Sequence, residues 1–72
     1  MSVSSAVVTV GEELLSGATV DSNAAWLGGA LGQLGIPVRA RWTVGDRDDQ
    51  IARVVAQALA EHDLVVVTGG LG

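Results

Sequence analysis

Hydrophobic positions along the chain follow two alternating spacings, which predict strands and helices in turn. Runs of branched apolar residues at 6–10 and 64–67 are typical of buried strands, and residues 38–44 alternate apolar and polar positions as a third strand does. Between these segments, apolar residues recur every three or four positions, which is the spacing of one helix face. They are Ala24, Leu27, Leu31 and Leu34 in the first helix, and Ile51, Val54, Val55, Ala58 and Leu59 in the second.

Helix-capping residues delimit the first of these helices. Residues 21–23 (Asp-Ser-Asn) are expected to cap its start, and Gly35 with Pro37 to end it. Glycines at positions 28, 29 and 32 lie inside it, and each costs about 1 kcal/mol relative to alanine. We therefore expect this helix to be stable only where it packs closely on the sheet or on another helix.

The second helix has a stronger apolar face and its own polar signals. Asp46 is expected to cap it, and Asp49 to form an ion pair with Arg53 one turn later. His62 falls in the last turn, where an imidazole interacts favourably with the helix dipole, and this role is favoured over metal binding.

The order strand, helix, strand, helix, strand is typical of parallel strands joined by right-handed crossovers. We therefore predict an α/β fold, namely the N-terminal β-α-β-α-β portion of a three-layer α/β/α domain with a mainly parallel sheet. All strands of such a sheet end on the same edge.

The composition is that of a domain interior. Among 72 residues, 49% are hydrophobic, 17% are charged and none is cysteine, so no disulfide compensates for a small core. The last strand is apolar on both faces, and nothing after it covers them. We expect residues 1–72 to be a partial domain, truncated at the glycine loop that follows this strand.

Net charge and the length of the apolar runs disfavour several classes of partner. The net charge is −4, with four arginines and no lysine, whereas nucleic-acid binding needs a basic face. No apolar run approaches the roughly 20 residues of a membrane-spanning helix, and the N-terminus lacks the basic region of a signal peptide. A cytoplasmic protein is the expectation.

Glycines, carboxylates and a threonine follow the three predicted strands. They are Gly11 and Glu12 after the first, Gly45 and Asp46 after the second, and Thr68, Gly69, Gly70 and Gly72 after the third. Open α/β folds bind ligands at the carboxyl edge of the sheet, where closely spaced glycines can form an anion-binding nest. The start of the first helix, with Asp21 and Asn23, offers further N–H groups to an anion. The convergence of these loops predicts a site for a phosphorylated small molecule.

The carboxylates at this edge would repel a bare phosphate. Glu12, Asp21 and Asp46 are explained if they hold a hard cation such as Mg²⁺ that bridges to the ligand, or if they accept hydrogen bonds from a sugar or heterocycle. Structural roles stay open, because aspartates are good N-caps and glycines are common in turns. Trp26 and Trp42 are interpreted as packing residues rather than as residues that stack on a ligand.

Five motifs stand in order along the chain: GEELL at 11–15, SG at 16–17, DSN at 21–23, GD at 45–46 and TGGLG at 68–72. In this order they resemble the motifs of the molybdopterin-binding superfamily of MoaB/Mog type, and most of all the N-terminal domain of the competence/damage-inducible CinA branch. The resemblance implies an α/β/α sandwich that binds molybdopterin or a nucleotide-like phosphorylated ligand, in a protein expected to be a homo-oligomer.

The resemblance also implies an activity. CinA-type domains are associated with metal-dependent hydrolysis of the pyrophosphate bond of ADP-ribose, and Mg²⁺ is the expected metal. Two alternatives stay open: adenylyl transfer to molybdopterin, as in molybdenum-cofactor biosynthesis, and a module that binds molybdopterin or a nucleotide without turning it over.

Site residues are carried over by position. Asp46 and Glu12 are the expected catalytic and metal-contacting residues. The expected ligand-binding residues are Gly11, Asp21, Asn23, Gly45, Thr68, Gly69, Gly70 and Gly72. Glu12 departs from the family, which more often has aspartate there, and the family's proline and acidic pair after the glycine loop lie beyond Gly72. We therefore expect residues 1–72 alone to be inactive.

Overall fold

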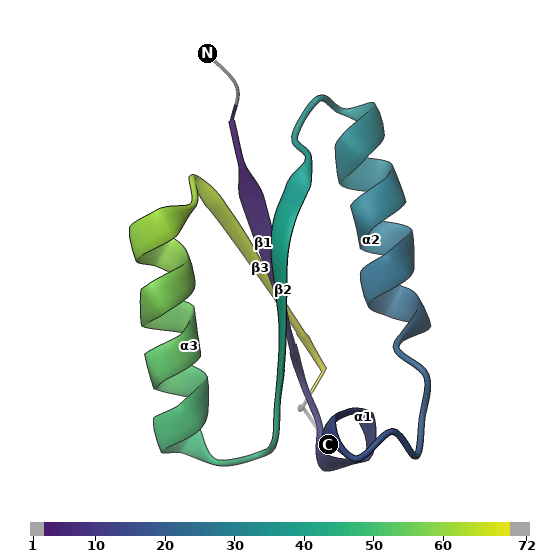
Figure 1. The fold of residues 1–72 in the computed structure, drawn as a ribbon, viewed down its shortest axis with the longest axis vertical. Coiled ribbons are helices and arrows are strands. Elements are labelled where there is room, and N and C mark those ends of the chain that lie inside the picture. Colours follow the sequence, from purple (N-terminus) through teal and green to yellow (C-terminus); the bar gives the residue numbers. More distant parts are fainter. Residues whose placement is uncertain (1–2, 70–72) are drawn as a thin grey trace.

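The computed structural model describes residues 3–69, which form a three-stranded parallel sheet and three helices (Figure 1). The elements are β1 (Ser5–Val10), α1 (Glu12–Leu15), α2 (Ser22–Gln33), β2 (Val38–Val44), α3 (Asp48–Glu61) and β3 (Leu64–Gly69). The predicted order of strands and helices is confirmed, with one short helix, α1, that the sequence pattern did not predict. Within residues 3–69, none of the helices combines the length and the apolar character of a bilayer-spanning segment.

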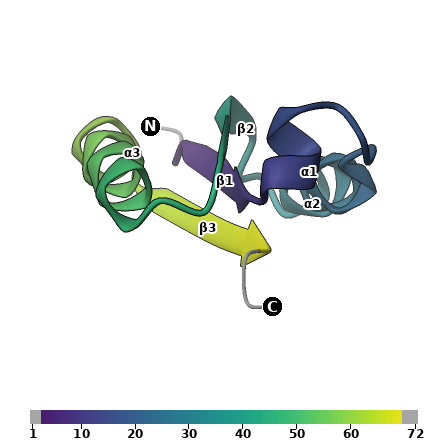
Figure 2. The ribbon, with the colours of Figure 1, turned by 90° about the horizontal axis from the view of Figure 1, so that it is seen from below.

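The strand order β2-β1-β3 determines where the helices lie. The chain passes from β1 to β2 on one side through α2, and then returns through α3 to β3 on the other side of β1. Because both crossovers are expected to be right-handed, connections that run in opposite directions place their helices on opposite faces of the sheet. Figure 2 shows α3 on one face and α1 with α2 on the other. The predicted α/β/α arrangement is therefore confirmed.

The core is built around β1, whose six residues are all buried. Ala6, Val8 and Val10 form a cluster with Val44 of β2 and Ala58 of α3. A central strand covered on both faces and paired on both edges has no solvent side, which explains why its sequence is a continuous apolar run rather than an alternating one.

The two hydroxyl groups buried in β1 are both satisfied. Ser5 donates a hydrogen bond to the carbonyl of Pro37 at 3.0 Å, and Thr9 shares one with the Thr43 hydroxyl, also at 3.0 Å. Buried polar groups that keep their hydrogen bonds add little cost to the core.

The N-cap residue predicted from the sequence is confirmed for α2 but not for α3. Asp21 caps α2 as predicted, since its Oδ1 accepts a hydrogen bond from the Ala24 N–H at 3.1 Å. The prediction that Asp46 caps α3 is wrong, because the N-cap residue is Arg47 and its side chain makes no capping bond. The reason is that Asp46 lies one residue outside the cap position, where its own N–H is bonded to Glu12.

The ion pair predicted between Asp49 and Arg53 is replaced by one between Asp49 and Arg47, with 3.3 Å between Nε and Oδ1. Both side chains are more than half exposed, so this pair contributes little to stability. His62, predicted to lie in the last turn of α3, is instead its C-cap residue, with an extended backbone and its Nδ1 3.2 Å from the Ser4 hydroxyl.

The three glycines inside α2 do not allow close packing among the described residues. A Cβ atom placed on Gly28, Gly29 or Gly32 would meet nothing within 4 Å. The close packing that we expected this helix to need is therefore not found at these three glycines within residues 3–69. Instead they line a groove of about 520 Å³ between α2 and β2, whose opposite wall includes Arg39 and Arg41.

We predict that Gly28→Ala and Gly32→Ala each raise the free energy of unfolding of the full-length natural protein, by up to about 1 kcal/mol, because alanine favours the helix and meets no neighbour. Gly35 is the matched control. Its φ of +79° is unfavourable for alanine, so Gly35→Ala should destabilise. Urea denaturation measures all three. Destabilisation by Gly28→Ala or Gly32→Ala would show that another part of the protein packs against this face.

Candidate functional site

All three strands end on the same row of the sheet. Val10 is in register with Val44 on one side and with Gly69 on the other, so the loops that follow β1, β2 and β3 leave from one edge. Figure 1 shows α1 and the first turns of α2 and α3 at this same lower edge. Parallel pairing thus brings together the segments that the sequence singled out.

The end of β3 requires a glycine. Gly69 has a φ of +81°, and a Cβ atom there would lie 2.5 Å from the carbonyl oxygen of Val10. A side chain is therefore excluded both by the backbone conformation and by the close approach of β1. The chain order also reverses between β1 and β3, which is the switch point where open α/β sheets form their ligand crevice.

A row of threonines crosses the sheet one position before its edge. Thr9 is in register with Thr43 of β2 and Thr68 of β3, and its hydroxyl also donates to the carbonyl of Trp42 at 3.3 Å. Sequence reasoning selected Thr68 and overlooked the other two. The signal was present, since Thr-Val-Gly occurs both at 9–11 and at 43–45. The hydrogen bond between the Thr9 and Thr43 hydroxyls joins the ends of β1 and β2 beneath the site.

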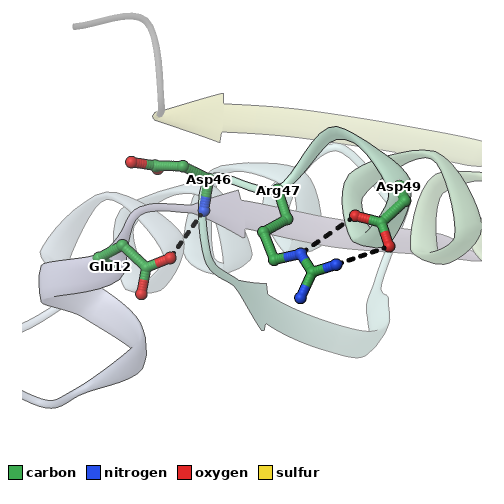
Figure 3. A network of polar contacts seen from close by, with 4 residues as sticks. All are labelled: Glu12, Asp46, Arg47 and Asp49. Atoms are coloured by element: carbon green, nitrogen blue, oxygen red, sulfur yellow. Dashed lines mark hydrogen bonds and ion pairs between the residues drawn. The ribbon is translucent and has the colours of Figure 1, made fainter.

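The loops after β1 and β2 are bonded to each other. The Gly11 N–H donates to the Val44 carbonyl at 2.9 Å, which extends the β1–β2 ladder past the strands. Glu12 then accepts a hydrogen bond on Oε1 from the Asp46 N–H at 3.1 Å. Gly45 is buried beneath this contact. In Figure 3, the Asp46 carboxylate extends away from the Arg47–Asp49 ion pair, on the other side of its loop.

Asp21 contributes one oxygen that the fold does not use. Its Oδ1 caps α2, whereas Oδ2 is buried and has no hydrogen-bond partner among residues 3–69. Asn23, in the first turn of α2, is exposed. An unpaired buried carboxylate oxygen is costly, and a hydrogen-bond donor on a ligand would satisfy it.

The described residues do not by themselves fit a closed metal site. Within residues 3–69, no three Asp, Glu or His side chains gather closely enough to hold an ion. One oxygen of Glu12 is already bonded to Asp46. Mg²⁺ is often held by one or two carboxylates together with ligand phosphates, so a metal at this edge would depend on groups outside these residues.

The remaining predicted residues have mixed outcomes. Gly70 and Gly72 lie outside the described residues. Trp42 is half-buried and packs against the core cluster, as predicted. Trp26 is 71% exposed, so its predicted packing role is wrong for the part of the chain that is described.

Comparison with known proteins shows which family the chain resembles. A family model described as "Probable molybdopterin binding domain" matches residues 6–72. A CinA-like protein of Chlorobium limicola is 46% identical over 92% of the chain, and one of Salinibacter ruber is 48% identical over the same share. The chain covers 15% and 16% of these two relatives.

A solved structure extends the comparison to three dimensions. The CinA protein of Thermoplasma acidophilum, described as of unknown function, superposes with a TM-score of 0.93 at 44% sequence identity. The match covers 99% of this chain and 42% of that protein. The resemblance seen in the motifs is thereby confirmed: the chain belongs to the molybdopterin-binding domain family and is related to CinA.

Proposed function

We propose that this chain supplies part of the site of a CinA-like protein that binds a phosphorylated nucleotide and hydrolyses its pyrophosphate bond, with an ADP-ribose-type compound as substrate. The observation that carries the proposal is the convergence of three strand ends on one row, beside the glycine-requiring switch point at Gly69. The chain spans about one sixth of the length of the two CinA-like relatives compared, so the activity belongs to the full-length natural protein.

The two kinds of group at this edge suit the two halves of a nucleotide. In the first turn of α2 the N–H groups of Ser22 and Ala24 are bonded to Val20 and Asp21, and the remaining N–H groups are suited to phosphate oxygens. The glycine-rich sequence that begins with Gly69 is likewise typical of an anion-binding loop. The unpaired Oδ2 of Asp21 is suited to a donor, such as a ribose hydroxyl, and repels an anion. A ligand that carries both phosphates and hydroxyl groups satisfies both.

Asp46 is the carboxylate that we assign to the ligand. Its side chain is exposed at the strand ends and makes no hydrogen bond or ion pair within residues 3–69, while its backbone N–H is bonded to Glu12. Thr68 and Gly69 complete the described part of the site on the β3 side. We include Mg²⁺ in the assay because a pyrophosphate ligand brings oxygen atoms that bind it well.

A second candidate is favoured by the description of the matching family model, which names molybdopterin as the ligand. Molybdopterin also combines a phosphate with hydrogen-bond donors on its heterocycle. The same edge would then bind the pterin, either for adenylyl transfer or without turnover.

The full-length natural protein should hydrolyse ADP-ribose to AMP and ribose 5-phosphate, and should do so faster with Mg²⁺ than with EDTA. Chromatographic separation of the two products measures this. Absence of both products, together with adenylylation of molybdopterin from ATP, would replace the first proposal by the second. Binding of either ligand without formation of any product would show that the protein binds the ligand without turning it over.

Asp21→Asn should weaken binding of ADP-ribose by about tenfold or more without changing the melting temperature. Asparagine caps a helix as well as aspartate does, but it places an amide N–H₂ group at the position of Oδ2, the oxygen that we expect to accept a hydrogen bond from the ligand. Titration calorimetry on the full-length natural protein measures the affinity. Unchanged affinity in a stable variant would show that Asp21 caps α2 but does not contact the ligand.

A further inference from the structure

We propose that Glu12 is a positioning residue, whose carboxylate fixes the loop that carries Asp46 rather than binding a metal ion. This inference rests on the proposed function to the extent that Asp46 contacts the ligand. The contact between Glu12 and the loop is itself a property of the fold, and it is tested separately below.

The first supporting observation is the hydrogen bond between the two loops. Glu12, the first residue of α1, accepts on Oε1 from the Asp46 N–H at 3.1 Å, across 34 positions of sequence (Figure 3). A bond from an N–H group to an ionised carboxylate is stronger than one between neutral groups. It fixes the backbone of Asp46 and therefore the starting point of its side chain.

The second observation is that Gly45 leaves room for this carboxylate. A Cβ atom on Gly45 would overlap the Oε1 atom of Glu12. Gly45 does not have a positive φ, so its backbone conformation does not require a glycine. A side chain at position 45 would therefore have to displace the Glu12 carboxylate, which lies over Gly45 while bonding to the next residue.

The third observation is that the backbone carrying Glu12 is itself fixed. The Gly11 N–H donates to Val44, and the carbonyl of Gly11 accepts from the N–H groups of Leu14 and Leu15 at 3.2 and 3.0 Å. Glu12 thus projects from a short helix that is tied to the end of β2. Such a carboxylate is held in place before any ligand arrives.

Two substitutions of Glu12 distinguish a positioning role from metal binding. Glu12→Gln keeps a carbonyl oxygen that can accept from Asp46 but removes the charge that a metal ion needs. Glu12→Ala removes both. A positioning role therefore predicts that glutamine rescues what alanine loses, whereas metal ligation predicts that both variants fail together.

The first readout is hydrogen exchange at the Asp46 amide of the full-length natural protein, followed by NMR. We expect exchange about tenfold faster in Glu12→Ala and close to wild type in Glu12→Gln, since only alanine removes the acceptor. Glu61→Ala is the charge control, because it removes the same charge from the exposed end of α3, away from the strand ends. Equal exchange in Glu12→Ala and wild type would overturn the proposal.

Gly45→Ala tests the same contact from the other side. Its Cβ should displace the Glu12 carboxylate, so Asp46 exchange should rise as it does in Glu12→Ala. The double variant should exchange no faster than either single one, because the two substitutions break one interaction. Additive effects, or a Gly45→Ala variant with wild-type exchange, would contradict the proposed contact.

The second readout is kcat/KM for ADP-ribose over a series of Mg²⁺ concentrations. Glu12→Gln should stay within about threefold of wild type with the same Mg²⁺ dependence, and Glu12→Ala should lose about tenfold or more. A higher Mg²⁺ requirement in Glu12→Gln would make Glu12 a metal ligand and overturn the proposal. Inactive wild-type protein would instead count against the proposed function, while the exchange readout would still decide whether Glu12 holds the loop.

Discussion

Burial of β1 between two parallel neighbours is the constraint on which the rest of this structure depends. All six of its residues are buried, and it is hydrogen-bonded along both edges to β2 and β3. Parallel neighbours must be joined by crossovers that pass over the sheet. Because the two connections run in opposite directions from β1 and from β2, they put a helix on each face. The same pairing brings three chain segments, far apart in sequence, to one edge. Fold and site therefore have a common cause.

The site is organised by close approaches of backbone and by single carboxylate oxygens rather than by a cluster of charges. Gly69 must be a glycine because the Val10 carbonyl lies where its side chain would be. One oxygen of Glu12 accepts a hydrogen bond from the Asp46 N–H, and one oxygen of Asp21 accepts a hydrogen bond from the N–H of Ala24 in α2. Two acidic residues thus serve the fold with one oxygen each. What distinguishes Asp21 is that its other oxygen is buried and unpaired among residues 3–69.

The sequence predicted the strands and long helices because their apolar spacings are local and strong. It also placed the strand-end glycines and carboxylates on one edge, since parallel order alone requires this. It missed α1, because four residues are too few to show a helical period. It assigned Asp46 to a helix cap because capping rules see only neighbouring residues, whereas the group that holds Asp46 is Glu12, 34 positions away. The roles of Thr9 and Thr43 likewise depend on strand register.

The proposed ligand binds at the carboxyl edge of the sheet. An NMR titration of the full-length natural protein with ADP-ribose and Mg²⁺ tests it most directly, since it reports binding at each backbone amide whether or not turnover occurs. The largest shifts within this chain should fall on Gly11, Asp46 and Gly69, with little change at Gly29 or Arg41. Shifts centred on the groove between α2 and β2, or no shifts at the strand ends, would contradict it.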